Sequence, residues 1–260
     1  MNHTYLEQLY NLEGKTAIVT GGSQGIGRGI AVSLANFGAS VTVIGRNQAL
    51  LEETVAEVRA AGGCCDAVVL DVSDRDASRA FFDRYMEEHP QLDIFVNNAG
   101  FTVRSELADT ADQDIDALLS TNLVGALTLL NKAANRMKAQ RSGSIVVITS
   151  VNGLNPLPGQ GMYSVTKFAL EGATKALASS LAEYGVRVNS CAPGAIDTAM
   201  NAAALADPAA MEATLKKIPM SAVGAPADIG DVVACMVSDA CRYMTGATVV
   251  VDGGLSLKHK

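Results

Sequence analysis

The feature that most constrains this chain is a regular alternation of short apolar runs with longer amphipathic stretches. The runs that have the composition of buried strands are Thr16–Thr20, Ser40–Ile44, Asp66–Leu70, Asp93–Val96, Ser144–Thr149, Arg187–Cys191 and Thr248–Val251. The stretches between them that predict helices are Gly25–Asn36, Gln48–Ala61, Asp76–Glu88, Asp112–Ala139, Tyr163–Glu183 and Ile229–Val237. Strands spaced by helices are typical of βαβ units, whose parallel sheet is covered on both faces. Crossover connections between parallel strands are right-handed, and this limits the possible topologies to doubly wound arrangements. We therefore expect an α/β Rossmann fold, with residues 1–260 forming a single dinucleotide-binding domain.

One segment, Pro193–Ala225, interrupts this rhythm because it is rich in alanine and methionine and contains Pro208 and Pro219. Helices are expected within it at Ala199–Leu205 and Pro208–Lys217. Ligands of such sheets bind at the carboxyl edge, where this segment should lie. We expect residues 195–225 to form a mobile lid on the substrate side, and the alternative is an ordinary packed helical hairpin.

The composition excludes several classes of protein. Of the 260 residues 48% are hydrophobic and 18% are charged, which is enough for a large core and excludes intrinsic disorder. The formal net charge of −7 argues against nucleic acid as the main partner. No apolar run approaches the ~18 residues of a membrane span. The start of the chain lacks the pattern of a secretory signal, so we expect a cytoplasmic protein that does not bind membranes.

The cysteines and histidines predict neither disulfides nor a metal site. The cysteine count of 5 is odd, and no CxxC pair occurs, which favours reduced thiols. Two of the 3 histidines, His3 and His259, lie near the chain ends, so no zinc site is expected.

A glycine-rich turn follows the first predicted strand. Residues 20–27 read TGGSQGIG, so Gly21, Gly25 and Gly27 stand between a strand and a helix. Glycine allows a tight turn and lets the backbone approach a pyrophosphate closely. The following helix start offers unpaired N–H groups and a partial positive charge. A purely structural turn is the alternative, but the position at the first strand–helix junction favours a dinucleotide site.

The end of the second predicted strand indicates which dinucleotide binds. An acidic residue there would hold the ribose 2′-hydroxyl of NAD, whereas arginine would accept the 2′-phosphate of NADP. The sequence is Val43-Ile44-Gly45-Arg46-Asn47, which contains no acid. Because a guanidinium suits a phosphate, we expect NADP(H) to be preferred over NAD(H).

Motifs spread over nearly the whole chain resemble those of the short-chain dehydrogenase/reductase family. They are TGGSQGIG, Asp71-Val72, the NNAG at residues 97–100, Ser150, the YSVTK at residues 163–167 and the PGAIDT at residues 193–198. The resemblance implies a seven-stranded parallel sheet with helices on both faces, and a homo-oligomer, either dimer or tetramer. Many NADP-using members carry a basic residue where this chain has Gln24, so the NADP assignment rests on Arg46, helped by Ser23. The residues then expected to bind the cofactor are Gly21, Ser23, Gln24, Gly25, Ile26, Gly27, Arg46, Asn47, Asp71, Val72, Asn98, Ala99, Gly100, Tyr163, Lys167, Pro193, Gly194, Ile196 and Thr198.

The reactive residues expected from the same motifs are Ser150, Tyr163 and Lys167. Tyr163 and Lys167 are spaced i, i+4 and share one helix face. We expect the Lys167 ammonium to lower the pKa of the Tyr163 phenol, which makes it a general acid and base. Ser150 ends a strand at the ligand-binding edge, where its hydroxyl can bond the substrate oxygen. The resemblance further implies that Lys167 contacts the nicotinamide ribose and that Asn122 holds a water linking Lys167 to solvent.

Together these features predict an oxidoreductase that interconverts a secondary alcohol and a ketone with NADP(H). The residues expected at the substrate are Thr102, Arg104, Ser150, Asn152, Tyr163 and Met200. This mixture of polar and apolar groups fits a steroid or bile acid, or a keto-sugar acid. One alternative is a 3-oxoacyl-(acyl-carrier-protein) reductase, which would favour a basic patch at the mouth of the site. Another is a non-catalytic NADP-binding regulator, which would be expected to have lost Tyr163 or Lys167.

Overall fold

A seven-stranded parallel sheet forms the centre of the protein in a computed structural model that describes residues 3–201 and 206–257. The strand order is β3-β2-β1-β4-β5-β6-β7, and every neighbouring pair is parallel. The strands are β1 (Thr16–Thr20), β2 (Ser40–Gly45), β3 (Cys64–Val69), β4 (Ile94–Asn97), β5 (Gly143–Ile148), β6 (Val186–Pro193) and β7 (Thr248–Val251). This topology confirms the predicted doubly wound Rossmann fold.

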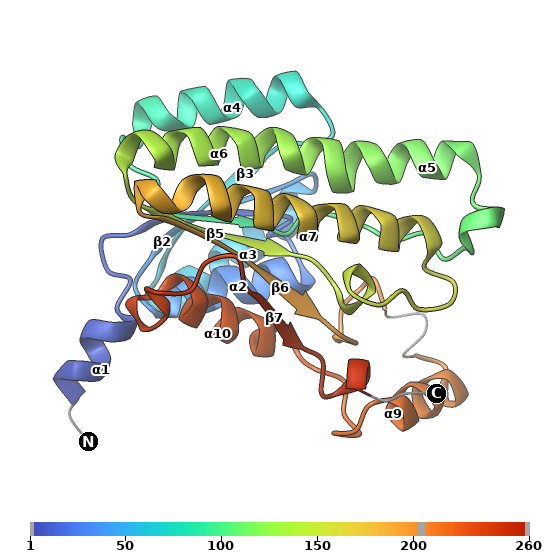
Figure 1. The fold of residues 1–260 in the computed structure, drawn as a ribbon. Helices are drawn as coiled ribbons and strands as arrows, with labels where there is room; N and C mark the ends of the chain where they lie inside the picture. Colours follow the sequence, from blue (N-terminus) through green and yellow to red (C-terminus); the bar gives the residue numbers. More distant parts are fainter. Residues whose placement is uncertain (1–2, 202–205, 258–260) are drawn as a thin grey trace.

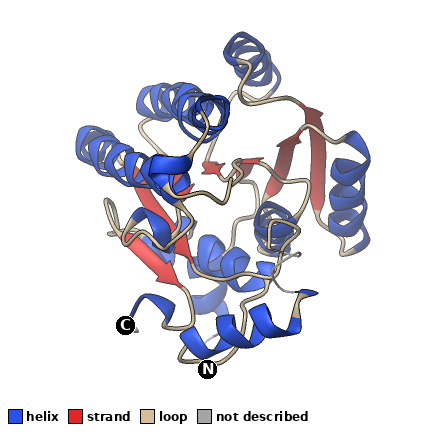
Figure 2. Ribbon diagram, turned by 90° about the vertical axis from the view of Figure 1, so that its right-hand side faces the viewer, coloured by secondary structure: helices blue, strands red, loops and turns tan. Residues whose placement is uncertain are grey.

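Helices cover both faces of the sheet (Figures 1 and 2). One layer contains α2 (Gly25–Asn36), α3 (Gln48–Ala60) and α10 (Pro226–Val237). The opposite layer contains α4 (Arg75–Glu88), α5 (Asp112–Leu118), α6 (Ala126–Gln140) and α7 (Gly161–Leu181). Helix α1 (His3–Tyr10) lies near the N-terminus, and α9 (Pro208–Lys217) stands apart from the body of the molecule (Figure 1).

The two helix layers explain why the strands are almost continuously apolar. Successive strand side chains point to opposite faces of a sheet. Val19 packs into the cluster that contains Ile30 of α2 and Ile229 of α10. Its neighbour Ile18 packs into the other cluster, with Leu129 of α6. Both faces of the sheet are covered by helices. A polar side chain at Val19 or Ile18 would therefore be buried without a hydrogen-bond partner.

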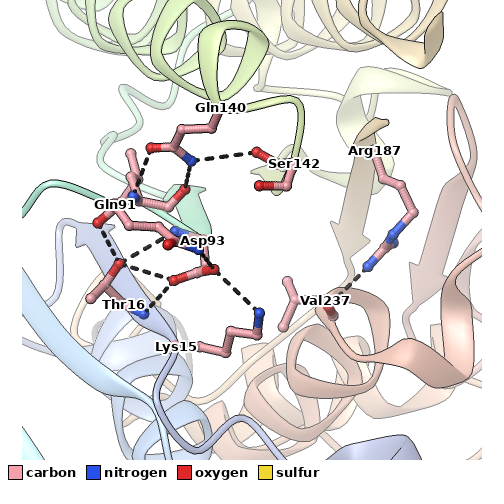
Figure 3. Close-up of polar contacts among 9 residues, drawn as sticks. Lys15, Thr16, Gln91, Asp93, Gln140, Ser142, Arg187 and Val237 are labelled. Atoms are coloured by element: carbon pink, nitrogen blue, oxygen red, sulfur yellow. Dashed lines mark hydrogen bonds and ion pairs between the residues drawn. The ribbon is translucent and has the colours of Figure 1, made fainter. Parts of the chain in front are cut away.

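Polar side chains tie the strands together at the amino-terminal edge of the sheet (Figure 3). The Asp93 carboxylate accepts hydrogen bonds from the Thr16 backbone N–H at 3.0 Å and from the Lys15 ammonium at 3.3 Å. The Gln140 amide bonds both backbone groups of Leu92, at 3.0 and 2.9 Å. Asp93 therefore precedes the strand as an anchor, and β4 begins one residue later than predicted.

Other differences from the predicted elements occur at edges and interruptions. Strand β3 is shifted toward the N-terminus of the predicted Asp66–Leu70 and is largely exposed, because it lies at the sheet edge. The predicted helix 112–139 is interrupted by a π-helical turn, Leu119–Gly125. Helix α9 has the predicted bounds. Of the predicted helix Ala199–Leu205, residues 199–201 form a turn, and the remainder lies outside the described residues.

Among residues 3–201 and 206–257, no helix combines the length and the apolar character that a membrane crossing requires. The same part of the chain contains no group of three or more histidine, cysteine or acidic side chains that could hold a metal ion.

Candidate active site

A cleft of about 290 Å³ lies at the carboxyl edge of the sheet and crosses the point between β1 and β4 where the strand order reverses. Open α/β sheets bind their ligands at this point. Most of the predicted site residues line the cleft. They are Gly21, Ser23, Gln24, Gly25, Ile26, Gly27, Arg46, Asp71, Val72, Asn98, Ala99, Gly100, Thr102, Ser150, Asn152, Tyr163, Lys167, Pro193, Gly194, Ile196, Thr198 and Met200.

A second hollow, of about 600 Å³, lies at the opposite, amino-terminal edge. Three of its charged groups, Lys15, Asp93 and Arg187, already bond the protein (Figure 3). Lys15 pairs with Asp93 at 3.3 Å, and the Arg187 guanidinium donates to the backbone carbonyls of Met236 and Val237 at 2.7 and 2.9 Å. The smaller cleft is the candidate active site, because it combines the favoured edge with the reactive side chains.

The glycine-rich turn between β1 and α2 forms one wall of the cleft. Gly21 and Gly25 have φ values of +66° and +54°, which favour glycine. A Cβ on Gly27 would collide with the carbonyl oxygen of Gly21. The Asn98 amide donates to the carbonyls of Thr20 and Gly21 at 2.9 and 3.1 Å, so its side chain holds the turn in place.

The start of helix α2 faces this wall with its backbone donors available. Gln24 is the N-cap residue, and its side chain makes no capping hydrogen bond. The first N–H groups of a helix have no partner within the helix, and they carry partial positive charge. The turn therefore offers backbone donors to an anionic group, and its glycines leave room for one to approach closely. These features fit the pyrophosphate of a dinucleotide.

Arg46 and Asp71 stand together at the other end of the cleft. The Arg46 guanidinium is 73% exposed and lies 3.9 Å from the Asp71 carboxylate. Burial raises the pKa of Asp71, but bonds from the Ser73 hydroxyl and N–H, at 2.7 and 2.9 Å, together with the Arg46 charge, outweigh it and lower this pKa. Because so exposed an ion pair contributes little, Arg46 stays available to a phosphate.

Ser150, Tyr163 and Lys167 meet at the middle of the cleft. Ser150 is the second residue after β5, and its hydroxyl oxygen accepts the Asn152 backbone N–H at 3.1 Å. Tyr163 and Lys167 come from the first turns of α7, and both are buried. The Lys167 ammonium lies 5.6 Å from the centroid of the Tyr163 ring and donates to the Ile148 carbonyl at 2.9 Å.

Burial governs the protonation of this group. It raises the pKa of Tyr163 to about 12, against the opposite effect of a hydrogen bond with Ser150. It lowers the pKa of Lys167 to about 8, against the opposite effect of the Glu171 charge. The expectation that Tyr163 has a lowered pKa is therefore wrong, because the effect of burial outweighs any lowering by its neighbours. At neutral pH Tyr163 holds its proton, which suits a proton donor.

Asn122 lies behind the cleft, in the π-helical turn Leu119–Gly125. Its buried amide accepts the Phe101 N–H at 3.0 Å and donates to the Phe101 carbonyl at 2.8 Å. The π-helical turn directs this side chain inward, and such turns are frequent at functional sites. Asn122 holds the loop after β4 but does not line the cleft, and its predicted link to Lys167 stays a prediction.

The structure leaves Asn47 and Arg104 outside the cleft. The Asn47 side chain caps α3 by accepting the Leu50 N–H at 3.2 Å, so its side-chain oxygen is already used. Arg104 is exposed and does not line the cleft, and its predicted role in binding substrate stays a prediction. Gln160, which was not predicted, lines the cleft and accepts the Thr102 hydroxyl at 2.8 Å. Its position one helical turn before Tyr163 was the available signal.

The comparisons with known proteins agree with this geometry. A family model described as enoyl-(acyl carrier protein) reductase matches residues 21–256. The chain is 39% identical to 3-oxoacyl-(acyl-carrier-protein) reductase FabG of Staphylococcus aureus (strain Mu50) over 242 residues, covering 93% of this chain and 98% of the relative. It is 37% identical to 3beta-hydroxysteroid dehydrogenase 1 of Eggerthella lenta over 249 residues, covering 95% of each chain.

Among solved structures, a gluconate 5-dehydrogenase from Burkholderia cenocepacia, in complex with NADP and tartrate, superimposes with a TM-score of 0.92. That protein is 31% identical, and the match covers 98% of this chain and 100% of the other. The fold, the cleft and these relatives define an oxidoreductase with a Rossmann fold. The chain belongs to the short-chain dehydrogenase/reductase family.

Proposed function

We propose that this protein interconverts a secondary alcohol and a ketone, with NADP(H) as its cofactor. The observation that carries the proposal is the placement of Ser150, Tyr163 and Lys167 in the same cleft as the glycine-rich turn. The same cleft would therefore hold a dinucleotide on the turn and the reacting group of the substrate beside these three side chains. Tyr163 and Lys167 are both present, which disfavours the non-catalytic regulator.

The roles of the side chains follow from their chemistry. Bound NADPH supplies the hydride for a ketone reduction. In that direction the Tyr163 hydroxyl donates its proton to the carbonyl oxygen, and the Ser150 hydroxyl bonds the same oxygen as charge develops on it. The Lys167 ammonium stabilises the phenolate that remains. In the oxidative direction the phenolate takes the proton back.

The chain offers a partner to each part of the cofactor. The backbone donors at the turn would hold the pyrophosphate, and Arg46 with Ser23 would hold the 2′-phosphate. Asp71 and Val72 would contact the adenine. Lys167 would contact the nicotinamide ribose, and residues 193–198 the carboxamide. Support for NADP comes from the basic character of the β2 end and from the NADP-bound state of the Burkholderia cenocepacia structure.

The substrate end of the cleft favours an uncharged ketone. Its side chains include Phe101, Thr102, Asn152, Gln160 and Met200, which offer apolar surface and neutral hydrogen-bonding groups. Of the described residues that line the cleft, the cations are Arg46, at the other end, and Lys167. A sugar acid would need a further cation for its carboxylate. A ring-bearing ketone of the steroid type fits these groups better.

The mouth of the cleft disfavours a substrate carried on an acidic protein. Between β4 and the π-helical turn, one cation, Arg104, stands among five acids, which are Glu106, Asp109, Asp112, Asp114 and Asp116. Of these acids, Glu106 lies beside the loop before α7, since it accepts the Gly159 N–H at 2.7 Å. Like charges facing each other weaken association, so the acids oppose docking of an acyl carrier protein. The carrier-protein reductase remains the second candidate because of the 39% identical relative.

The test is NADPH oxidation against a panel of ketones, with Tyr163→Phe beside the wild type. The panel holds oxo-steroids, oxo-bile acids, keto-sugar acids and small cyclic ketones, and acetoacetyl groups on coenzyme A and on acyl carrier protein. Loss of the proton donor should lower kcat by about 10²–10⁴-fold and leave NADPH binding intact. The control Tyr184→Phe, which changes a tyrosine outside the cleft, should match the wild type.

The outcomes of this panel distinguish the candidate functions from one another. Turnover of free ketones that is lost in Tyr163→Phe supports the proposal. Turnover of the carrier-bound acetoacetyl group alone favours the second candidate. Tight NADPH binding without turnover of any ketone would revive the regulator, and wild-type rates in Tyr163→Phe would disprove the mechanism.

A further inference from the structure

A buried carboxylate that the mechanism does not use lies on the same helix as Lys167. Glu171 is on α7, one helical turn after Lys167, and is 5% exposed. Its two oxygens accept the hydroxyls of Thr149 at 2.5 Å, Ser190 at 2.8 Å and Thr248 at 2.7 Å. Burying a carboxylate is costly unless donors replace water. Three hydroxyls, one from the residue after β5 and one each from β6 and β7, supply that replacement, which marks a built position for a charged group.

Lys167 is buried as well and needs a counterion. Its ammonium is bonded to the carbonyl of Ile148, which is neutral. Besides Lys167, the titratable groups of the described residues around it are Tyr163 and Glu171 on α7 and Cys191 on β6. Burial raises the pKa of both Tyr163 and Cys191 to about 12, so neither carries charge near neutral pH. Of these groups, Glu171, one helical turn after Lys167, is therefore the anion whose charge acts on Lys167.

The same carboxylate also touches the strand end that carries the reactive serine. Thr149, which bonds Glu171, stands between Ile148 and Ser150. Ile148 supplies the acceptor for Lys167, and Ser150 lines the cleft. Glu171 thus connects to the site by charge through Lys167 and by a hydrogen bond through Thr149.

We propose that Glu171 is a positioning residue whose negative charge keeps Lys167 protonated over the working pH range. Its catalytic consequence rests on the proposed function, but the ionic coupling itself does not. Glu171 touches neither substrate nor cofactor, and it acts through the protonation of Lys167 and the position of the β5 end. The coupling is reciprocal, because Lys167 in turn offsets the cost of burying Glu171.

Removing the negative charge of Glu171 should change the pKa of Lys167 in one definite direction. Without the anion, the positive form of Lys167 is less favoured and its pKa falls. The alkaline limb of the reductive pH profile should therefore move to lower pH, by about one unit. A merely structural role would lower kcat without moving the profile.

The decisive experiment titrates Lys167 directly in Glu171→Gln, which keeps the shape and removes the charge. Protein labelled with ¹³C-lysine is followed by NMR, and the resonance missing from Lys167→Met identifies Lys167. The matched control Glu183→Gln removes a charge from an exposed glutamate on the 3-10 turn after α7. We expect the Lys167 midpoint to fall by about one unit in Glu171→Gln and to stay unchanged in the control.

An unchanged Lys167 midpoint in Glu171→Gln would overturn the proposal. If that variant does not fold, it is compared with Lys167→Met/Glu171→Gln, in which both charges are gone. Recovery of folding in the double variant supports the pairing, and no recovery assigns Glu171 a structural role only. Because the titration needs no substrate, it separates this proposal from the proposed function. A protein that reduces no ketone can still show the shift.

Discussion

At the scale of single residues, the choice of dinucleotide depends on Arg46. Its guanidinium lines the cleft at the end of β2 and is only weakly paired with Asp71, at 3.9 Å. A charge-assisted bond to a phosphate is worth about 1.5–3 kcal/mol, so Arg46→Ala should weaken NADPH binding about 10–100-fold. NADH has no 2′-phosphate, and its binding should change little. Fluorescence titration with both cofactors checks this.

The control for this substitution is Arg59→Ala, which removes a similar charge. Arg59 lies in the last turn of α3, pairs with Asp66 and does not line the cleft. It should bind both cofactors as the wild type does. An unchanged NADPH-to-NADH preference in Arg46→Ala would show that the assignment of NADP to this arginine is wrong.

The sequence motifs predicted most of the cleft lining. Their residues follow the strands or begin the helices, so the positions of the strands and helices also fix the positions of the motif residues. Tyr163 and Lys167 share a helix face whatever the rest of the chain does, and Ser150 must follow its strand. Glu171 could not be predicted in its role, since the partners of its carboxylate, such as Ser190 and Thr248, come from distant strands. The pKa of Tyr163 was predicted wrongly because burial, which dominates it, is invisible in a motif.

At the scale of elements, helix α9 is exposed within the described part of residues 195–225. No residue of α9 is buried, whereas the chain is anchored on both sides of it. Ile196 pairs with Gly224 in an isolated bridge, and the buried Ile218 follows α9 directly. We therefore propose that α9 moves as a unit between these anchors when the cleft is filled.

Limited trypsin digestion tests this lid. Cleavage after Lys217, in the last turn of α9, needs an open segment. NADPH at about ten times its dissociation constant should slow that cleavage about tenfold if it holds the lid closed. Cleavage after Arg141, in the loop before β5 at the far edge, is the internal control. Equal protection at both sites would indicate general stabilisation, and unchanged rates would favour a packed hairpin.

Periodicity predicted the long elements but not their interruptions. Strand β1 and helices α2 and α9 have the predicted bounds, because glycine, proline and polar residues mark their ends. The segment Leu119–Gly125 also contains polar residues and a glycine, but helices flank it on both sides, so the pattern predicted one continuous helix. The π-helical turn exists because Asn122 bonds both backbone groups of Phe101, a contact between separate elements.

At the scale of the whole molecule, the sheet order follows from local rules. Alternating strands and helices with right-handed crossovers allow few arrangements, and the observed reversal between β1 and β4 is one of them. Both clusters of the core are built from the predicted strands, which is why the fold could be expected from the sequence. Association between copies leaves no comparable trace, since it depends on which exposed faces match.

Helix α7 presents a face on which such association can be tested. Val165 and Phe168 are 43% and 44% exposed, and a Cβ on Gly172 would meet nothing within 4 Å. These positions share one helical face, and the missing side chain at Gly172 lets a partner backbone approach. We propose that a second copy of the chain packs its own α7 here, in a symmetric dimer.

Phe168→Asp should break this dimer. Burying a phenylalanine stabilises by about 1.5–3 kcal/mol, and a two-fold interface contains it twice. The dimer should therefore weaken by about 3–6 kcal/mol, and sedimentation velocity at micromolar concentration should show monomers. Tyr243→Asp, which changes a fully exposed aromatic outside α7, should sediment as the wild type does. A wild-type protein that sediments as a monomer would rule out the dimer, and a Phe168→Asp variant that stays associated would place the interface on another face.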